Sequence, residues 1–176
     1  MFILEGVERY KVELLPHNPF WKEEFLEVKD KFETVLNNVL VDIQHVGSTA
    51  IPTVWAKPIL DVAIFAKRFG NTEIEKIKKL GYDYCGVNDN NPNYHLFVLR
   101  GENNISLHHI HCYDKVGCGF EQLVGFRDYL NENESIAIQY DKLKKSLLKQ
   151  YKDDRQQYTN SKAEFIRAVY NKIDGI

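Results

Sequence analysis

The fold is decided by residues 43–65, which read IQHVGSTAIPTVWAKPILDVAIF. Two apolar runs flank a small Gly47-Ser48 turn and a loop that holds two prolines and a lysine. The second run carries one acidic residue, Asp61, among Ile, Leu, Val and Phe. A carboxylate inside such a strand is costly to bury unless it is paired or binds a cation. Asp61 is therefore either a functional residue or a strand-end residue that hydrogen-bonds a neighbouring backbone group.

Length and composition describe an ordinary globular chain. It has 176 residues, of which 44% are hydrophobic and 27% charged, and its net charge is −2. This length supports a single domain over residues 1–176 with a substantial core. The near-neutral charge and the lack of a long basic and aromatic stripe argue against nucleic acid as the main partner.

Three features of the sequence predict a cytoplasmic protein. The N-terminus lacks a basic start followed by an apolar core, so no signal peptide is expected. No apolar run has the length of a membrane span, so no membrane partner is expected either. The three cysteines are odd in number and form no CxxC pair, which is typical of free thiols in a reducing compartment.

Periodicity divides the chain into a sheet-rich part, residues 10–114, and a helical part, residues 117–174. The expected elements of the first part are a strand at 10–15, a helix at 19–38, strands at 41–46 and 58–66, a helix at 71–80, a strand at 82–85, a polar loop at 88–93, and a hairpin of strands 94–100 and 104–113. The second part should hold helices at 120–130 and 135–151 and one long helix from Asp153 onward. Asn18 should cap the first helix, and Gly81 should end the second. The predicted fold class is α+β.

The spacing of the Gly-Ser turn and Asp61 carries a chemical signal. Twelve residues separate Ser48 from Asp61, and the two lie on or beside adjacent expected strands. Glycine lets the backbone approach a phosphate closely, and the serine and neighbouring amides can hydrogen-bond its oxygens. The pattern resembles the nucleotidyltransferase superfamily, in which Gly-Ser or Gly-Gly precedes Asp-x-Asp or Asp-x-Glu on the next strand. Such paired carboxylates hold divalent cations that bridge phosphates.

Five ordered blocks make the resemblance more specific. They are HVGSTAIP at 45–52, AKPILD at 56–61, HHIH at 108–111, FRDYL at 126–130, and DRQQY at 154–158 with KAEFI at 162–166. Together they resemble the GrpB family, which is placed in the nucleotidyltransferase superfamily, and the match runs from about residue 12 to residue 165. The resemblance implies a nucleotidyltransferase-like mixed β-sheet with packed helices and a helical C-terminal third. It also implies phosphate contacts from Gly47 and Ser48.

One position departs from the superfamily pattern. The second carboxylate would fall two residues after Asp61, where the chain has Ala63. His109 and His111 alternate along an expected strand and should project on one face, whereas His108 should project on the other. With Asp61 they would form a 2-His-1-carboxylate site for a divalent metal such as Mg²⁺, Mn²⁺ or Zn²⁺. The alternative is that the histidines are polar residues that line a pocket or are hydrogen-bonded in the core.

Several polar residues are candidate phosphate contacts, each with a structural alternative. His45 adjoins the Gly-Ser turn, but it could equally be hydrogen-bonded across the sheet. Lys57 precedes a proline, which favours an extended backbone near the turn, or it is an exposed lysine. Arg155, Tyr158 and Lys162 are spaced i, i+3 and i+7 on one expected helix face, as in an anion clamp. Their alternative is a solvated face or a salt bridge between helix and sheet.

Three functions follow from these residues. The first is a nucleotidyltransferase-like enzyme that binds a nucleotide or other phosphorylated small molecule with a divalent metal and uses Asp61 in catalysis. The second is an inactive ligand-binding module of the same fold, which Ala63 favours. The third is a metal-dependent hydrolase that uses Asp61, His109 and His111. The adjacent Arg127 and Asp128 are predicted to form a structural pair at a helix surface.

Overall fold

The protein is described by a computed structural model that places residues 6–8 and 11–174. Its main elements, in chain order, are α1 (Phe20–Val35), β1 (Leu40–Val46), β2 (Leu60–Ala66), α2 (Asn71–Lys79), β3 (Tyr82–Asn88), β4 (Asn91–Arg100), β5 (Ser106–Tyr113), α3 (Phe120–Glu132), α4 (Glu134–Gln150), α5 (Arg155–Asn160) and α6 (Ala163–Asp174). Short 3-10 turns cover Ser48–Ala50 and Glu102–Asn104. Within the described ranges, none of the helices combines the length and the apolar character that crossing a membrane requires.

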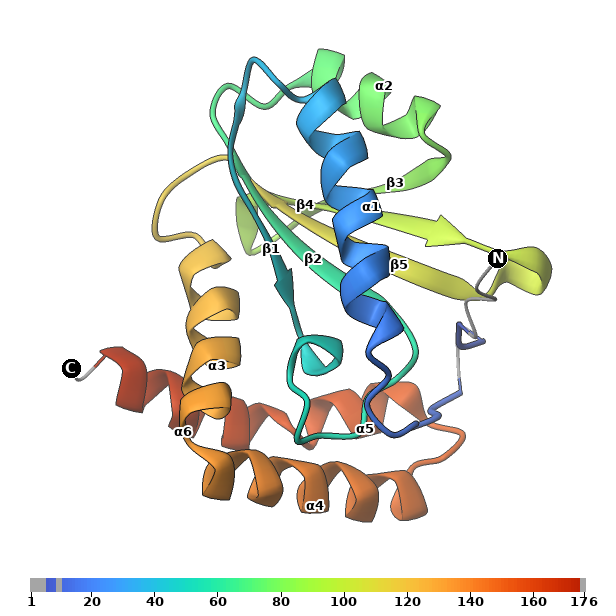
Figure 1. Ribbon diagram of the computed structural model, residues 1–176, viewed down its shortest axis with the longest axis vertical. Helices are drawn as coiled ribbons and strands as arrows, with labels where there is room; N and C mark the ends of the chain where they lie inside the picture. Colours follow the sequence, from blue (N-terminus) through green and yellow to red (C-terminus); the bar gives the residue numbers. More distant parts are fainter. Residues whose placement is uncertain (1–5, 9–10, 175–176) are drawn as a thin grey trace.

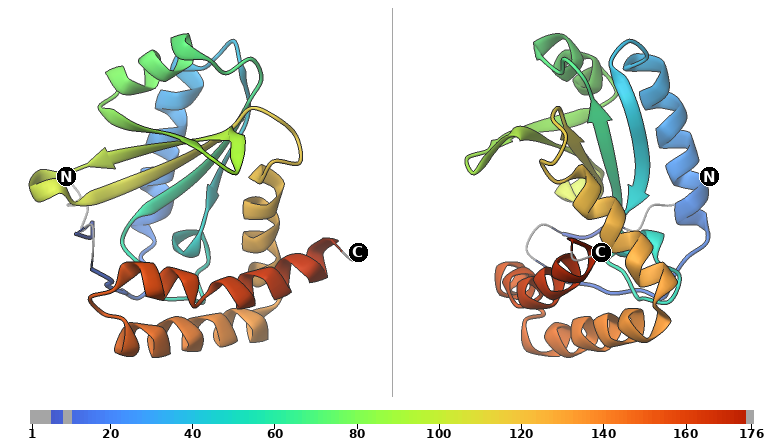
Figure 2. Two further views of the ribbon diagram at one scale, coloured as in Figure 1. Left: turned by 180° about the vertical axis from the view of Figure 1, so that it is seen from behind. Right: turned by 90° about the vertical axis from the view of Figure 1, so that its left-hand side faces the viewer.

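The five strands form one mixed sheet in the order β1-β2-β5-β4-β3. β2 and β5 pair in parallel, and the other neighbours are antiparallel. Helices α1 and α2 cover one face, α3 packs against the other, and α4, α5 and α6 gather at one end of the sheet (Figures 1 and 2). This arrangement confirms the predicted α+β fold with a helical C-terminal third.

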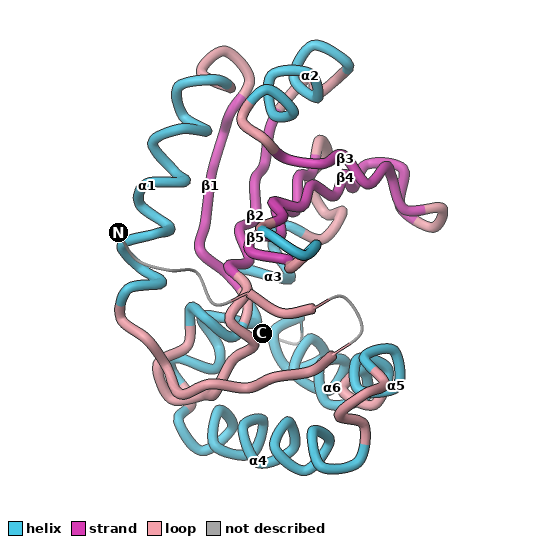
Figure 3. The backbone as a smooth tube through the Cα atoms, turned by 90° about the vertical axis from the view of Figure 1, so that its right-hand side faces the viewer, coloured by secondary structure: helices cyan, strands magenta, loops and turns pink. Residues whose placement is uncertain are grey.

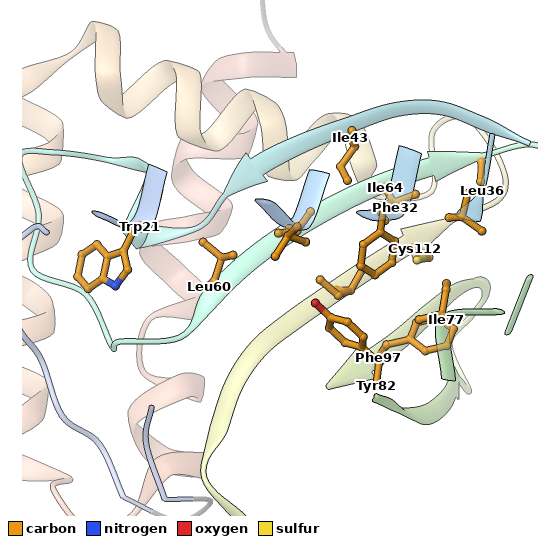
Figure 4. Packing of buried hydrophobic residues seen from close by; sticks show 14 of the residues in the cluster. Trp21, Phe32, Leu36, Ile43, Leu60, Ile64, Ile77, Tyr82, Phe97 and Cys112 are labelled. Carbon is orange, nitrogen blue, oxygen red and sulfur yellow. The ribbon is translucent and has the colours of Figure 1, made fainter. Parts of the chain in front are cut away.

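The main core lies between α1, α2 and one face of the sheet. Figure 4 shows Phe32 and Leu36 of the α1 segment near Ile64 of β2, with Leu60 of β2 toward Trp21, all in the largest apolar cluster. The Asn18 side chain accepts a hydrogen bond of 3.1 Å from the backbone N–H of Phe20 where α1 begins, as predicted for a helix start. This packing holds one face of β2 against the core and leaves the opposite face of the strand available for polar residues.

The predicted strand at 10–15 is wrong over its described part. Residues 11–14 form no strand, and Leu15 makes only an isolated bridge with Ala56; Tyr10 lies outside the described residues. The backbone N–H of Val12 donates to the carbonyl of Lys152 at 3.1 Å. Because its hydrogen bonds go to the loop before β2 and to the segment after α4, this segment ties the helical end to the sheet instead of extending it.

Two other predicted elements need correction. The polar loop at 88–93 is only a two-residue turn, because Asn88 pairs with Asn91 and the ladder continues along β3 and β4. The single long helix after Asp153 is two helices, α5 and α6, that are interrupted by turn residues 161 and 162. Figure 3 shows both helices beside α4. Lys162, at the break, lies with its Nζ 4.6 Å from the centre of the Tyr158 ring.

Smaller boundary differences do not change the architecture. The first helix ends at Val35 rather than at residue 38, and β2 begins at Leu60 rather than at Pro58. Gly81 has φ of +94° and its N–H donates to the carbonyl of Lys78 at 2.9 Å, which confirms it as the residue that ends α2.

Candidate functional site

The parallel pair β2 and β5 brings three polar side chains together. Asp61 lies opposite His109, and Ala63 lies opposite His111. Because alternate strand residues share a face, Asp61, His109 and His111 all project away from the α1 core. His109 Nδ1 lies 3.4 Å and His111 Nε2 lies 3.2 Å from the same carboxylate oxygen of Asp61. The prediction that the two histidines share a face, with Asp61 nearby, is confirmed.

The pKa shifts of Asp61 and His109 favour the protonation states that bind a cation. Burial raises the pKa of Asp61, but the hydrogen bonds to His109 and His111 outweigh it and hold this pKa well below its usual value. Burial lowers the pKa of His109 despite the neighbouring carboxylate. One ligand atom from each of the three residues lies within 4.8 Å of the others. An ionised carboxylate and a neutral imidazole are the forms that ligate metal ions.

Gly47 is required by the close approach of Asp61. Its φ is +70°, and an added Cβ would lie 2.6 Å from Oδ2 of Asp61. A side chain here would be strained by the backbone and would collide with the carboxylate. The glycine therefore lets the Gly47-Ser48 turn lie directly against Asp61.

A cavity of about 180 Å³ opens beside this turn. It is lined by Leu14, Gly47, Ser48, Thr49, Lys57, Asp61, Leu123, Phe126, Tyr140, Lys144, Tyr158, Lys162, Ile166 and Tyr170. The lining therefore combines the glycine turn and β2 with side chains from α3, α4, α5 and α6. Asp61 belongs both to the cavity and to the histidine triad, so the two sites adjoin.

Comparison with known proteins identifies the family to which the chain belongs. The sequence model of the family described as GrpB protein matches residues 11–172. This chain belongs to the GrpB family. The Glutamate-rich protein GrpB of Alkalihalophilus pseudofirmus is 32% identical over 172 residues, which cover 96% of this chain and 99% of that protein. The UPF0157 protein YqkA of Bacillus subtilis is 35% identical over 90% of this chain, but only 46% of YqkA is covered.

Two solved structures resemble this chain, one from the same family and one from outside it. The crystal structure of the conserved protein GrpB from Enterococcus faecalis matches this GrpB chain with a TM-score of 0.81 and 26% identity, over 92% of this chain and 96% of that one. The Cid1 poly(U) polymerase, solved with MgGTP bound, matches with a TM-score of 0.52 and 9% identity, over 77% of this chain and 44% of that chain. The second likeness shows the fold alone, and it confirms the nucleotidyltransferase-like architecture.

Lysines of the GrpB cavity have unusually low pKa values. Burial, together with the charges of Lys162 and Arg155, lowers the pKa of Lys57 to about 7. Burial likewise lowers the pKa of Lys162 to about 8. Both residues, which the sequence singled out as phosphate contacts, line the cavity, and so does Tyr158. Arg155 is not among the lining residues, although its charge affects both lysines.

The sequence analysis missed Lys144, the most buried lysine of the cavity. Its side chain is 2% exposed, and its Nζ donates to Ser48 Oγ at 2.9 Å and to the backbone carbonyl of Trp55. Burial lowers its pKa to about 7. The sequence did contain one signal for this residue. Lys144 lies one turn after Tyr140 on the apolar stripe of α4, where a charged residue is not expected to face the core.

His45 lies near the turn but does not line the cavity. Its Nε2 lies 2.9 Å from Thr49 Oγ1, and its ring stacks on Phe25 at 5.2 Å. Burial lowers its pKa to about 4. The hydrogen bond is made to the 3-10 turn rather than across the sheet.

His108 and Arg127 have structural partners. His108 faces the α1 side, as predicted, where Nε2 lies 2.6 Å from Glu24 Oε1 and Nδ1 lies 2.8 Å from the Tyr82 hydroxyl. Arg127 pairs with Asp128 at 2.7 Å, as predicted. It also donates to the backbone carbonyl of His45 at 2.8 Å, so it fastens α3 to β1.

Proposed function

We propose that this GrpB protein is a metal-dependent, nucleotidyltransferase-like enzyme that acts on a nucleotide or other phosphorylated small molecule. Asp61, His109 and His111 hold a divalent cation, and Gly47, Ser48, Lys57 and Lys162 contact phosphate. One observation carries the proposal: three metal-ligand atoms converge within 4.8 Å at the edge of a cavity in which lysines outnumber carboxylates. Phosphate chemistry needs this combination of a cation and positive groups around developing negative charge.

The replacement of the second carboxylate is consistent with this site. Ala63 is fully buried on β2 and lies opposite His111 on β5. His109 and His111 therefore supply donor atoms from the neighbouring strand. Two imidazoles are neutral ligands, so the site offers one negative charge where Asp-x-Asp offers two. A mixed nitrogen and oxygen donor set favours Zn²⁺ or Mn²⁺ over Mg²⁺.

Metal-dependent hydrolysis is the second candidate, and the donor set favours it. Three protein ligands leave further coordination positions open, which is how catalytic zinc sites admit a water molecule. In both candidate reactions the bound cation supplies charge that offsets the phosphate oxygens. Asp61 and the histidines hold it, while the lysines orient the phosphate.

Isothermal titration of metal-free protein with Zn²⁺, Mn²⁺ and Mg²⁺, followed by ATP, CTP, GTP and UTP, tests the proposal. We expect Zn²⁺ or Mn²⁺ binding that Asp61→Asn weakens at least about 100-fold. The matched control is Asp83→Asn, which removes an exposed carboxylate that forms an ion pair with Arg100. Wild-type protein that binds none of these metals would contradict the proposal.

Product analysis then separates the reactions. Transfer of the nucleotide α-phosphate to an added acceptor indicates a nucleotidyltransferase, whereas products formed with water alone indicate a hydrolase. Metal and ligand binding without turnover identifies a binding module and rules out the proposed catalysis.

A further inference from the structure

We infer that the cavity beside Asp61 is a site for a compact phosphomonoester, one phosphate on a skeleton of a few carbon atoms, and that it excludes a nucleoside. The inference narrows the proposed function to a phosphorylated small molecule other than a nucleotide, and with it to the hydrolase candidate, and it rests on that function because Asp61 joins the cavity to the metal ligands. Four properties of the cavity support it: its charge, an unpartnered hydroxyl, its size and its apolar walls.

The first property is a group of three lysines that lack acidic partners among the described residues. Lys57 comes from the loop before β2, Lys144 from α4 and Lys162 from the turn before α6, and all three line one cavity. Among the described residues, none of the three has a carboxylate within ion-pair distance. Asp61 is the cavity's one acidic lining residue, and it is engaged by His109. Buried lysines with a purely structural role are normally paired, so this charge is suited to a dianion.

The second property is an unpartnered hydroxyl. Tyr158 is 0% exposed and lines the cavity, yet its hydroxyl has no hydrogen-bond partner among the described residues. A buried polar group without a partner is unfavourable unless a ligand supplies one. Lys162 Nζ lies 4.6 Å from the centre of the same ring. A ligand that reached the buried Tyr158 hydroxyl would supply its missing partner, next to an ammonium group.

The third property is size. A volume of about 180 Å³ equals roughly six waters at about 30 Å³ each, and it lies below the range of about 300–1,000 Å³ that is usual for drug-sized ligands. A phosphate group has about five heavy atoms, so it leaves room for only a few more. A nucleoside, with its base and sugar, is too large.

The fourth property is the chemistry of the remaining walls. Leu14, Leu123, Phe126 and Ile166 supply apolar surface. Inorganic phosphate would leave this surface facing only water, whereas a short carbon skeleton would cover it. The apolar walls therefore favour a phosphomonoester over free phosphate.

Titration of chelator-treated protein, repeated with Mn²⁺, with inorganic phosphate, glycerol 3-phosphate and ATP tests the inference. Glycerol 3-phosphate should bind at least tenfold more tightly than ATP and more tightly than phosphate. Tyr158→Phe should weaken it about tenfold, since a hydrogen bond to a charged group is lost, without loss of stability. Tyr151→Phe, a tyrosine outside the cavity lining, is the matched control and should bind as wild type does.

A lysine pair gives a second, independent readout. Lys162→Met should reduce glycerol 3-phosphate affinity at least tenfold, whereas Lys149→Met, at an exposed position of α4, should leave it unchanged. If ATP binds as tightly as glycerol 3-phosphate, or if neither glycerol 3-phosphate nor phosphate binds with or without Mn²⁺, the inference is wrong. Metal binding that depends on Asp61 would still support the proposed function in that case. Loss of metal binding with phosphomonoester binding retained would refute the proposed function instead.

Discussion

The two faces of the sheet are built from the same strands but satisfy their polar groups in opposite ways. On the α1 face, Leu60, Ile64 and Ile110 pack in the main core, and the polar His108 is bonded at both ring nitrogens. On the opposite face, Asp61 and its histidine neighbours adjoin a cavity with three lysines and an unpartnered tyrosine hydroxyl. Both ring nitrogens of His108 are bonded within the chain, whereas the Tyr158 hydroxyl of the cavity has no partner among the described residues.

This difference distinguishes the face that stabilises the fold from the face that we propose binds a ligand. Apolar burial and satisfied hydrogen bonds contribute free energy of folding. Buried charge without a partner lowers stability, and it persists where function needs it. Substitutions on the two faces should therefore separate stability from binding.

The largest expected effect is a loss of stability on the α1 face. Phe32→Ala removes a fully buried ring that meets Tyr82 edge to face at 5.3 Å. The free energy of unfolding, measured by urea denaturation, should fall by about 3–5 kcal/mol. Metal affinity at a temperature where the variant is folded should stay within about twofold of wild type. A loss below about 1 kcal/mol would contradict the assignment of this face as the stabilising one.

Adjacent histidines on opposite faces give the sharpest test of the comparison. His108→Asn leaves Glu24 and the Tyr82 hydroxyl without their partner, so stability should fall by about 2 kcal/mol while Zn²⁺ affinity is retained. His109→Asn should change stability by less than about 1 kcal/mol and weaken Zn²⁺ binding by about 100-fold. Urea denaturation and metal titration of both variants check the result; if the two affect the same property, the faces do not differ in role.

Lys144→Met should raise stability in a pH-dependent way. Its pKa is about 7, lowered by burial and by the charges of Lys162, Lys57 and Lys145 against the opposing effect of Asp141. Between about pH 7 and 10 the unfolded chain holds a proton that the folded lysine lacks, so wild-type stability rises with pH. The variant should be about 1–2 kcal/mol more stable near pH 6, and because a pKa shift is worth about 1.4 kcal/mol per unit, this advantage should disappear and then reverse toward pH 10. Urea denaturation of both proteins across this pH range measures the difference in their free energies of unfolding.

The matched control for this prediction is Lys145→Met. Lys145 is the next residue of α4 and pairs with Asp141 at 2.7 Å at a partly exposed position. Its replacement should change stability by about 0.5 kcal/mol or less, with no change in the pH slope. If Lys144→Met is instead less stable near pH 6 with the slope unchanged, Lys144 serves only to hold Ser48 and the Trp55 carbonyl.

The smallest expected effect concerns the tyrosines that bond histidines on the two faces. Tyr94 lies 2.9 Å from Nδ1 of His111, and Tyr84 lies 3.0 Å from Nδ1 of His95. Tyr94→Phe should weaken Zn²⁺ binding about tenfold, because a hydrogen bond that orients a metal-binding histidine is lost. Tyr84→Phe removes a similar bond on the α1 side and should leave Zn²⁺ affinity unchanged. Competition titration against a zinc chelator resolves both.

Local sequence was enough for most of the strands and for the shared face of His109 and His111, whereas the position of Asp61 beside them depends on the pairing of β2 with β5. Strand alternation repeats every two residues, so the common face of His109 and His111 follows from the chain itself. Gly47 could likewise be predicted at a turn, and the ordered blocks indicated the family. The strand expected at 10–15 failed because its hydrogen-bond partners, Ala56 and Lys152, are distant in the chain.

The cavity could be recognised only in the tertiary structure. Ser48 and Lys144 are 96 residues apart, yet they are hydrogen-bonded. The break between α5 and α6, the partner of His45 and the unpartnered Tyr158 hydroxyl likewise depend on which helix faces meet at the end of the sheet. Periodicity tells which residues share a side of one element, but it contains no information about which element that side will meet. The sequence by itself therefore determined most of the strands and the common face of His109 and His111, and packing of the C-terminal helices determined the cavity beside them.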